Sequence, residues 1–345
     1  MKKFICLFCL AFCLISTVAA QKVSISNQEI QRLKKEALQG NVDSQIMLGA
    51  MYLAGKGGAN YAEAAKWFRM AAEKGDATTQ LILAKMYLTG QGVTKNYAEA
   101  AKWFRMAAEQ GNAEAQQALG KMYYNGEGVT QDYDVAVKWY RKAADQGNAE
   151  AQLSLGSAYQ KGRGVTQDSK EAVNWYRKAA DQGDASAQFL LGLMYYTGKD
   201  VTQDYKEAAK WFRKGAEQGV AIAQYRLGLL YEEGHGVTQN DDEAVKWYSK
   251  AAAQGHSNAQ YSLGLMYYTG RGVPQDYKEA FNLFRKGAEQ GDADAQYNLG
   301  LMYEEGNGVA VDYKEAEKWY RKSAAQGDED AKAALEELEQ KIKGN

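Results

Sequence analysis

Few residues in the chain of 345 could carry out chemistry, and they lie far apart in the sequence. The two histidines, His235 and His256, have no other histidine or cysteine near them at the spacing of a metal site. The three cysteines all fall within the first 20 residues, at Cys6, Cys9 and Cys13. The sequence therefore predicts no metal and no cofactor, and both histidines are expected to be exposed loop residues.

Catalytic groups of other kinds are not indicated either. Adjacent acids such as Glu232 and Glu233 point apart on a helix, which disfavours a cooperating acid–base pair. Gly-x-Gly sequences recur, but a phosphate loop follows a strand and often carries Lys-Ser/Thr, and Asp200 replaces the second glycine in one copy. Neither Ser-x-x-Lys nor Gly-x-Ser-x-Gly occurs. We therefore predict that the protein is not an enzyme.

The elements that position these residues are copies of one unit, typified by residues 115–147. A Leu-Gly pair returns every 36 residues, at Leu119-Gly120, Leu155-Gly156, Leu191-Gly192, Leu227-Gly228, Leu263-Gly264 and Leu299-Gly300. Leu83-Ala84 holds the same place one period earlier, and Leu48-Gly49 lies 35 residues before that. A fixed period of this size is typical of a stacked-repeat solenoid.

Each unit predicts two helices, here named helix A and helix B. Helical spacing places Ala115, Leu119, Met122 and Tyr123 on one face of helix A, and Ala136, Trp139, Tyr140 and Ala143 on one face of helix B. Gly126 ends the first helix, and Gly147 is expected to end the second in the left-handed conformation. Asp204 followed by Glu207 predicts a capping box at the start of helix B, with equivalents at Asp276/Glu279 and Asp312/Glu315. Trp residues at fixed phase in helix B are interpreted as core.

The motif A-Q-x-x-L-G-x-M-Y-x-x-G-x-G-V, followed by D-Y-x-E-A-x-K-W-Y-R-K-A-A-x-Q-G, resembles the Sel1-like repeat family, a relative of the tetratricopeptide repeats. The resemblance covers about residues 41–327, as eight repeats. It implies an all-α fold, a right-handed α-solenoid superhelix of eight 36-residue helix-turn-helix repeats with capping helices. It also implies a scaffold or adaptor that binds a protein or peptide.

The two ends differ from the repeats. Residues 1–20 have the pattern of a signal peptide, with Lys2 and Lys3, an apolar stretch at 4–14 and small residues before Gln21. The apolar stretch is short for a membrane span, and a lipoprotein signal through Cys13 is disfavoured by the bulky Phe12. We expect export to the periplasm or beyond the cell, with capping helices in residues 21–40 and 328–345.

The balance of charged residues bears on which classes of partner the protein could bind. Removing Lys2 and Lys3 leaves 40 of the 42 Lys and Arg side chains against 43 Asp and Glu. Such a balance provides no broad positive field for nucleic acid or an anionic membrane. We therefore expect neither as a partner, and the oligomeric state stays open.

The predicted binding residues lie on helices A of repeats 5 to 8, on the face opposite the core-facing Ala223 and Leu227 and expected to be concave. We call this set the A-face stripe: Phe189, Tyr196, Tyr225, Leu229, Glu232, Tyr261, Leu265, Tyr268, Tyr297 and Glu304. In repeats 3 and 4 the same positions are largely polar. Apolar groups with a polar rim often mark interaction sites, although neighbouring A helices could instead bury the stripe. Glu232 and Glu304 would favour a partner with basic character.

The sequence thus predicts a non-catalytic exported scaffold that binds a protein or peptide, in envelope function or host interaction. One alternative is a cell-wall-related or β-lactam-processing enzyme, like the family's cysteine-rich secreted members. It is disfavoured because nucleophile motifs and cysteines are missing after residue 20. A second alternative is a regulatory adaptor associated with the inner membrane.

Overall fold

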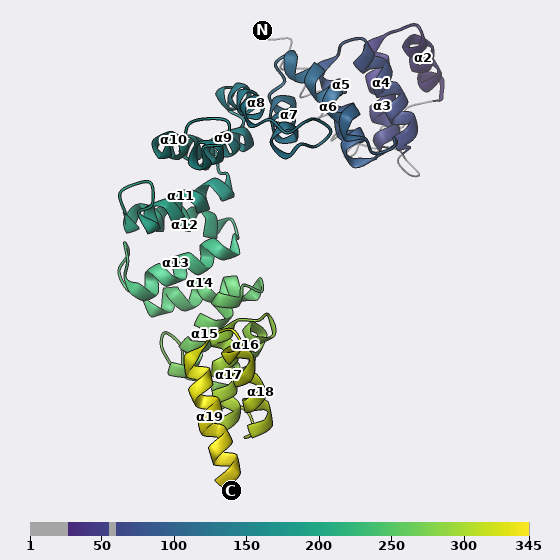
Figure 1. Ribbon diagram of the computed structural model, residues 1–345. Helices are drawn as coiled ribbons and strands as arrows, with labels where there is room; N and C mark the ends of the chain where they lie inside the picture. Colours follow the sequence, from purple (N-terminus) through teal and green to yellow (C-terminus); the bar gives the residue numbers. More distant parts are fainter. Residues whose placement is uncertain (1–26, 55–59, 345) are drawn as a thin grey trace. The chain divides into compact units, whose positions relative to one another are not determined.

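The computed structural model describes residues 27–54 and 60–344, and these ranges form eighteen α-helices and no strand (Figure 1). The expected signal peptide lies outside the described residues. The helices are α2 (Asn27–Leu38), α3 (Val42–Ala54), α4 (Tyr61–Glu73), α5 (Ala77–Thr89), α6 (Tyr97–Glu109), α7 (Ala113–Asn125), α8 (Tyr133–Asp145), α9 (Ala149–Lys161), α10 (Ser169–Asp181), α11 (Ala185–Thr197), α12 (Tyr205–Glu217), α13 (Ala221–Glu233), α14 (Asp241–Ala253), α15 (Ser257–Thr269), α16 (Tyr277–Glu289), α17 (Ala293–Glu305), α18 (Tyr313–Ala324) and α19 (Glu329–Gly344).

Helices α3 to α18 form the eight predicted A–B pairs, and α2 and α19 occupy the stretches expected for the end helices. The α2 helix buries Leu33 and Ala37 in one cluster with Leu48 and Trp67 of repeat 1. At the other end, Leu338 of α19 is buried with residues of α18. The chain divides into two compact units, Met1–Trp175 and Tyr176–Asn345, and the boundary falls inside α10. Repeats 5 to 8 therefore belong wholly to the second unit.

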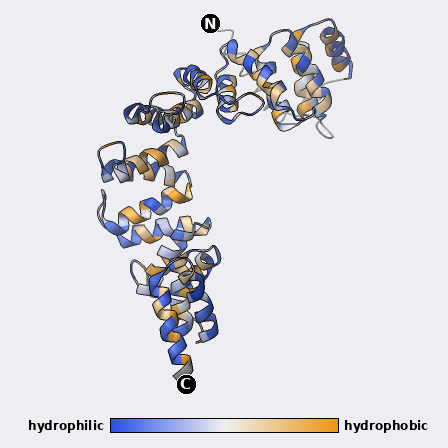
Figure 2. Ribbon diagram, in the orientation of Figure 1, coloured by the Kyte–Doolittle hydropathy of each residue, from blue (hydrophilic) through white to orange (hydrophobic). Residues whose placement is uncertain are grey.

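Each helix carries both hydrophobic and hydrophilic residues (Figure 2), and the hydrophobic ones at the predicted positions form the core. The tryptophans of helices B confirm this interpretation at six of their seven positions, where 2% to 7% of the side chain is exposed. Trp139 is only partly buried, and it lies in the repeat that has Val135 in place of the usual glutamate.

The Leu-Gly period has a steric cause. A Cβ atom added to Gly228 would lie 2.6 Å from the ring of Tyr248 in the following helix B. At Gly228 the aromatic ring packs directly on the backbone of helix A and leaves little room for a Cβ atom. A loop glycine is restricted in a similar way. Gly236 has φ 70°, and an added Cβ would lie 2.2 Å from the carbonyl oxygen of Tyr205. Asp200 adopts φ 74° at the equivalent position of repeat 5.

The start of helix B departs from the predicted capping box. Asp204 accepts the expected hydrogen bond from the backbone N–H of Glu207 at 3.0 Å. The reciprocal bond is replaced, because the N–H of Asp204 donates to the carbonyl of Tyr195 at 3.0 Å. The Glu207 carboxylate turns instead to the indole N–H of Trp211, at 3.2 Å. The glutamate therefore holds the core tryptophan, while aspartate alone caps the helix.

Candidate functional site

The A-face stripe lies on α11, α13, α15 and α17, and all ten predicted residues are partly buried. One aromatic ring of each helix rests on the ring of its own helix B, with centroids 5.8 to 5.9 Å apart; the pairs are Phe189–Phe212, Tyr225–Tyr248, Tyr261–Phe284 and Tyr297–Tyr320. The remaining part of each ring is accessible. The result lies between the two expectations, since each ring contacts a core ring and is still partly exposed.

The other members of the stripe are held in a similar way. Tyr196 and Tyr268 meet Tyr205 and Tyr277 edge to face, at 5.6 and 5.1 Å. Leu229 and Leu265 pack against the hydrophobic cores of repeats 6 and 7. The structure therefore brings the predicted residues together as a row of side chains with restricted orientations.

The two acids of the stripe, which are expected to favour a basic partner, both have partners within the chain. Glu232 accepts a hydrogen bond from the Tyr248 hydroxyl at 2.6 Å and forms an ion pair with Arg271 at 3.2 Å. Glu304 is bound in the same way by Tyr320 and by Lys341 of α19. Burial, and then the bond to Glu232, raise the pKa of Tyr248 far above its ordinary value, so its hydroxyl remains a donor. The carboxylates thus fix core tyrosines, and Glu232 shares Arg271 with Asp241, which lies 2.9 Å from the same guanidinium.

The histidines differ from each other. His235 is exposed as expected, contacting Glu233 at 2.9 Å and stacking on Tyr205. The expectation was wrong for His256, which is partly buried and caps α15 by accepting from the backbone N–H of Ala259 at 3.3 Å. Its ring stacks on Tyr225, with centroids 4.8 Å apart. Burial first, and then the charge of Arg226, lower the pKa of His256.

Arg226 of α13 is a residue that sequence reasoning missed. Its guanidinium lies 5.7 Å from the ring centroid of Tyr196 and 5.8 Å from that of Tyr225, so it joins repeats 5 and 6 within the stripe. The corresponding positions of the other repeats are neutral: Met47, Ile82, Ala118, Ser154, Leu190, Ser262 and Asn298. A comparison of the repeats at this position would have found it.

Most buried polar groups serve contacts between repeats. Gln224 donates to the carbonyl of Ala216 in the preceding repeat at 3.1 Å and accepts from Gln254, just after α14 of its own repeat, at 2.8 Å. Arginines of helices B donate to tyrosines 18 residues later, in the pairs Arg69–Tyr87, Arg105–Tyr123, Arg141–Tyr159, Arg177–Tyr195 and Arg213–Tyr231. These recurring glutamine and arginine–tyrosine hydrogen bonds give the polar residues a structural role, since buried polar groups need partners.

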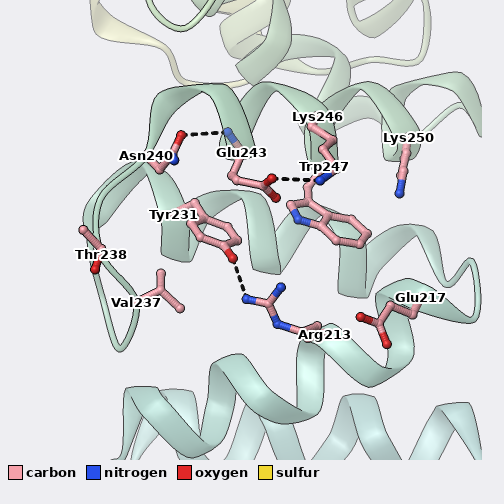
Figure 3. A pocket seen from close by; sticks show the side chains of 10 residues that line it. All are labelled: Arg213, Glu217, Tyr231, Val237, Thr238, Asn240, Glu243, Lys246, Trp247 and Lys250. Atoms are coloured by element: carbon pink, nitrogen blue, oxygen red, sulfur yellow. Dashed lines mark hydrogen bonds and ion pairs between the residues drawn. The ribbon is translucent and has the colours of Figure 1, made fainter.

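A cavity of about 720 Å³ is lined by residues of α12, α13, α14 and the loop before α14, and none of them belongs to the A-face stripe (Figure 3). Its cationic groups already have partners: Arg213 donates to Tyr231 at 2.5 Å, Lys246 pairs with Glu243 at 2.8 Å, and Lys250 lies 4.2 Å from the ring centroid of Trp247. A second cavity of about 700 Å³ has corresponding lining residues three repeats earlier, Lys138, Trp139 and Lys142. The same cavity thus forms wherever these repeat positions recur, and it is not interpreted as a separate binding site.

In the part of the chain that the structure describes, His, Cys, Asp and Glu side chains form no group of three or more that could hold a metal ion. None of its helices combines the length and the apolar character needed to cross a membrane.

The comparisons with known proteins agree with the repeat boundaries. The family model for the Sel1 repeat matches residues 42–76, 77–112, 113–148, 149–184, 185–220, 221–256, 257–292 and 293–328. The chain is similar to a solved protective antigen present in uropathogenic Escherichia coli strains and displaying an SLR fold. The identity is 40% and the TM-score 0.85, over 89% of this chain and 66% of that one, just under two thirds of its length.

A solved Sel1 repeat protein from Oxalobacter formigenes is 38% identical with a TM-score of 0.68, over 89% of both chains. A search of curated proteins gave no match. Eight contiguous family matches, on helices that pair as the repeat predicts, confirm the predicted solenoid fold. The chain belongs to the Sel1 repeat family.

Proposed function

We propose that this protein is a non-catalytic scaffold that binds a protein or peptide along helices A of repeats 5 to 8. The observation that supports the proposal is the row of aromatic rings at Phe189, Tyr225, Tyr261 and Tyr297. Each ring contacts a core ring at 5.8 to 5.9 Å and is still partly exposed. Large aromatic side chains are the usual anchors of binding energy.

The orientation of the rings matters for affinity. A side chain that is free in the unbound protein loses about 0.5–1.5 kcal/mol of entropy when an interface immobilises it. Rings already held by packing avoid much of this cost. Because one such ring recurs in each of four successive repeats, an extended segment could contact several of them at once.

The family supports the proposal at a coarser level. Sel1 repeat proteins typically mediate protein–protein interactions and are generally non-catalytic scaffolds. The similar Escherichia coli protein is described as a protective antigen. Together with the signal-peptide pattern of residues 1–20, this supports export to the periplasm or beyond the cell, in envelope function or host interaction.

The test uses a library of random nonapeptides with amidated C-termini, selected on the protein. Affinities of the selected peptides are then measured by fluorescence anisotropy. Replacing Tyr225 and Tyr261 together by Ala should weaken binding more than tenfold, because truncating an anchor costs about 2 kcal/mol or more. Circular dichroism should show little loss of helix.

Tyr267→Ala is the matched control. Tyr267 lies on α15 like Tyr261 and is also partly buried, but it belongs to the row that faces the arginines of helices B. Helix B of the preceding repeat has Ser249 at the position of the arginine, so the change breaks no tyrosine–arginine bond. Unaltered binding by the Tyr225/Tyr261 variant, or an equal loss in the control, would contradict the proposed function.

A further inference from the structure

We propose that Arg226 is the specificity-determining residue of this surface and that it binds an acidic side chain within an extended peptide, between Tyr196 and Tyr225. The inference rests on the proposed function and names the chemistry of the partner. It replaces the basic partner that the sequence suggested with an acidic one.

The first support is that the Arg226 guanidinium has unused donors. Its Nε is buried without a hydrogen-bond partner. Its two Nη groups also form no hydrogen bond, yet they are not among the buried unsatisfied atoms, so they reach the surface. None of the described carboxylates forms an ion pair with it, and its close contacts are the rings of Tyr196 and Tyr225. A partly buried polar group without partners requires an explanation.

The second support is that the nearby acids are already engaged. Glu232 binds Tyr248 and Arg271, as described above. Glu233 contacts His235 at 2.9 Å, and Asp292 caps α17 by accepting from Ala295 at 2.8 Å. Each of these acids is thus held by another contact, and none of them forms an ion pair with Arg226. Removing a charge from water is costly unless a counter-charge is supplied, and a bound carboxylate would supply it.

The shape of the site favours a carboxylate of a side chain. A guanidinium presents its N–H groups as a planar fork that matches a carboxylate, and rings beside it reduce its contact with water. Aromatic members of the stripe lie on both sides of Arg226, with Phe189 in repeat 5 and Tyr261 and Tyr297 in repeats 7 and 8. A segment that contacts them passes Arg226 in its middle, so the carboxylate comes from an internal Asp or Glu.

The experiment uses the amidated nonapeptide library, in which carboxylates come from side chains alone. Selected peptides should share an Asp or Glu at one fixed position. Changing that residue to its amide, or Arg226→Gln in the protein, should each weaken binding about 10- to 100-fold, the range for hydrogen bonds to charged groups. The two changes together should cost little more than either alone, and Arg226→Lys should restore part of the affinity.

The outcomes separate this inference from the proposed function. If the Tyr225/Tyr261 variant loses binding while Arg226→Gln binds normally, the inference is overturned and the function stands. If Arg226→Gln weakens the acidic peptide and its amide version equally, Arg226 acts only by packing on the rings, which also overturns it. Selected peptides without a shared acid count against it as well. If the peptides bind without needing the tyrosines, or no peptide is selected, both proposals fail.

Discussion

Alanine at Gly228 tests the steric origin of the repeat. The added Cβ would lie 2.6 Å from two carbons of the Tyr248 ring, so the ring has to move. The Tyr248 hydroxyl is bound to Glu232 at 2.6 Å, and this bond resists the movement. Gly264→Ala is the matched variant, because its Cβ would lie 2.7 Å from the ring of Phe284, which has no hydroxyl.

The magnitudes follow from three contributions. Alanine favours a helix over glycine by about 1 kcal/mol. Overpacking a core costs about 1–3 kcal/mol. Displacing Tyr248 also weakens a hydrogen bond to a charged group, worth about 1.5–3 kcal/mol. We therefore expect Gly228→Ala to destabilise by about 2–4 kcal/mol and Gly264→Ala by about 0–2 kcal/mol. Repeat 2 already holds Ala84 and Phe104 at the equivalent positions, both buried, which shows that alanine is accepted opposite a phenylalanine.

Native-state hydrogen exchange suits the measurement, because a chain of repeats need not unfold in one step and local opening energies are required. The amides of α13 should lose more protection in Gly228→Ala than those of α15 lose in Gly264→Ala. In a Tyr248→Phe background, Gly228→Ala should fall to the smaller cost. Equal costs in the two repeats, or no effect of Tyr248→Phe, would refute the role given to the hydroxyl.

Three further predictions concern stability. Trp175→Ala should cost about 3–5 kcal/mol as a buried deletion, whereas Lys170→Ala on the exposed side of α10 should stay within about 0.5 kcal/mol; similar shifts in urea denaturation would remove Trp175 from the core. Because burial and then Arg226 lower the pKa of His256, the folded state favours neutral imidazole, and stability should fall as pH decreases below about 6.5. Thermal melts from pH 7.5 to 5 should show less of this loss in His256→Asn, which keeps a capping acceptor that does not titrate. Asp200→Gly should raise the free energy of unfolding by about 0.5–1 kcal/mol, because φ 74° is strained for aspartate; an unchanged melting temperature would show that its side chain compensates.

Sequence reasoning identified the residues that share the A-face stripe but not the partners of its charged groups. The ten residues share one helical face, and helical phase is a local property that a sequence shows directly. The partners of Glu232 are Tyr248 and Arg271, 16 and 39 residues away, and such pairings depend on how helices and loops of successive repeats meet. Arg226 was not predicted for the same reason, because the Tyr196 ring that it contacts belongs to the preceding repeat. His256 was taken for an exposed loop residue because its contact with Tyr225 also lies far away in sequence.

By itself, the sequence determined the number of repeats, the helices and the core. A period of 36 residues, left-handed glycines such as Gly147 and apolar positions at helical spacing are all consequences of local backbone and side-chain physics. The tertiary structure alone decided which charges remain free. Stacking places Glu232 and Glu304 against hydroxyl and basic groups, but it brings Arg226 between two rings without a carboxylate. Free charge is a property of the three-dimensional neighbourhood, because the same side chain is neutralised or available depending on what the next repeat places beside it.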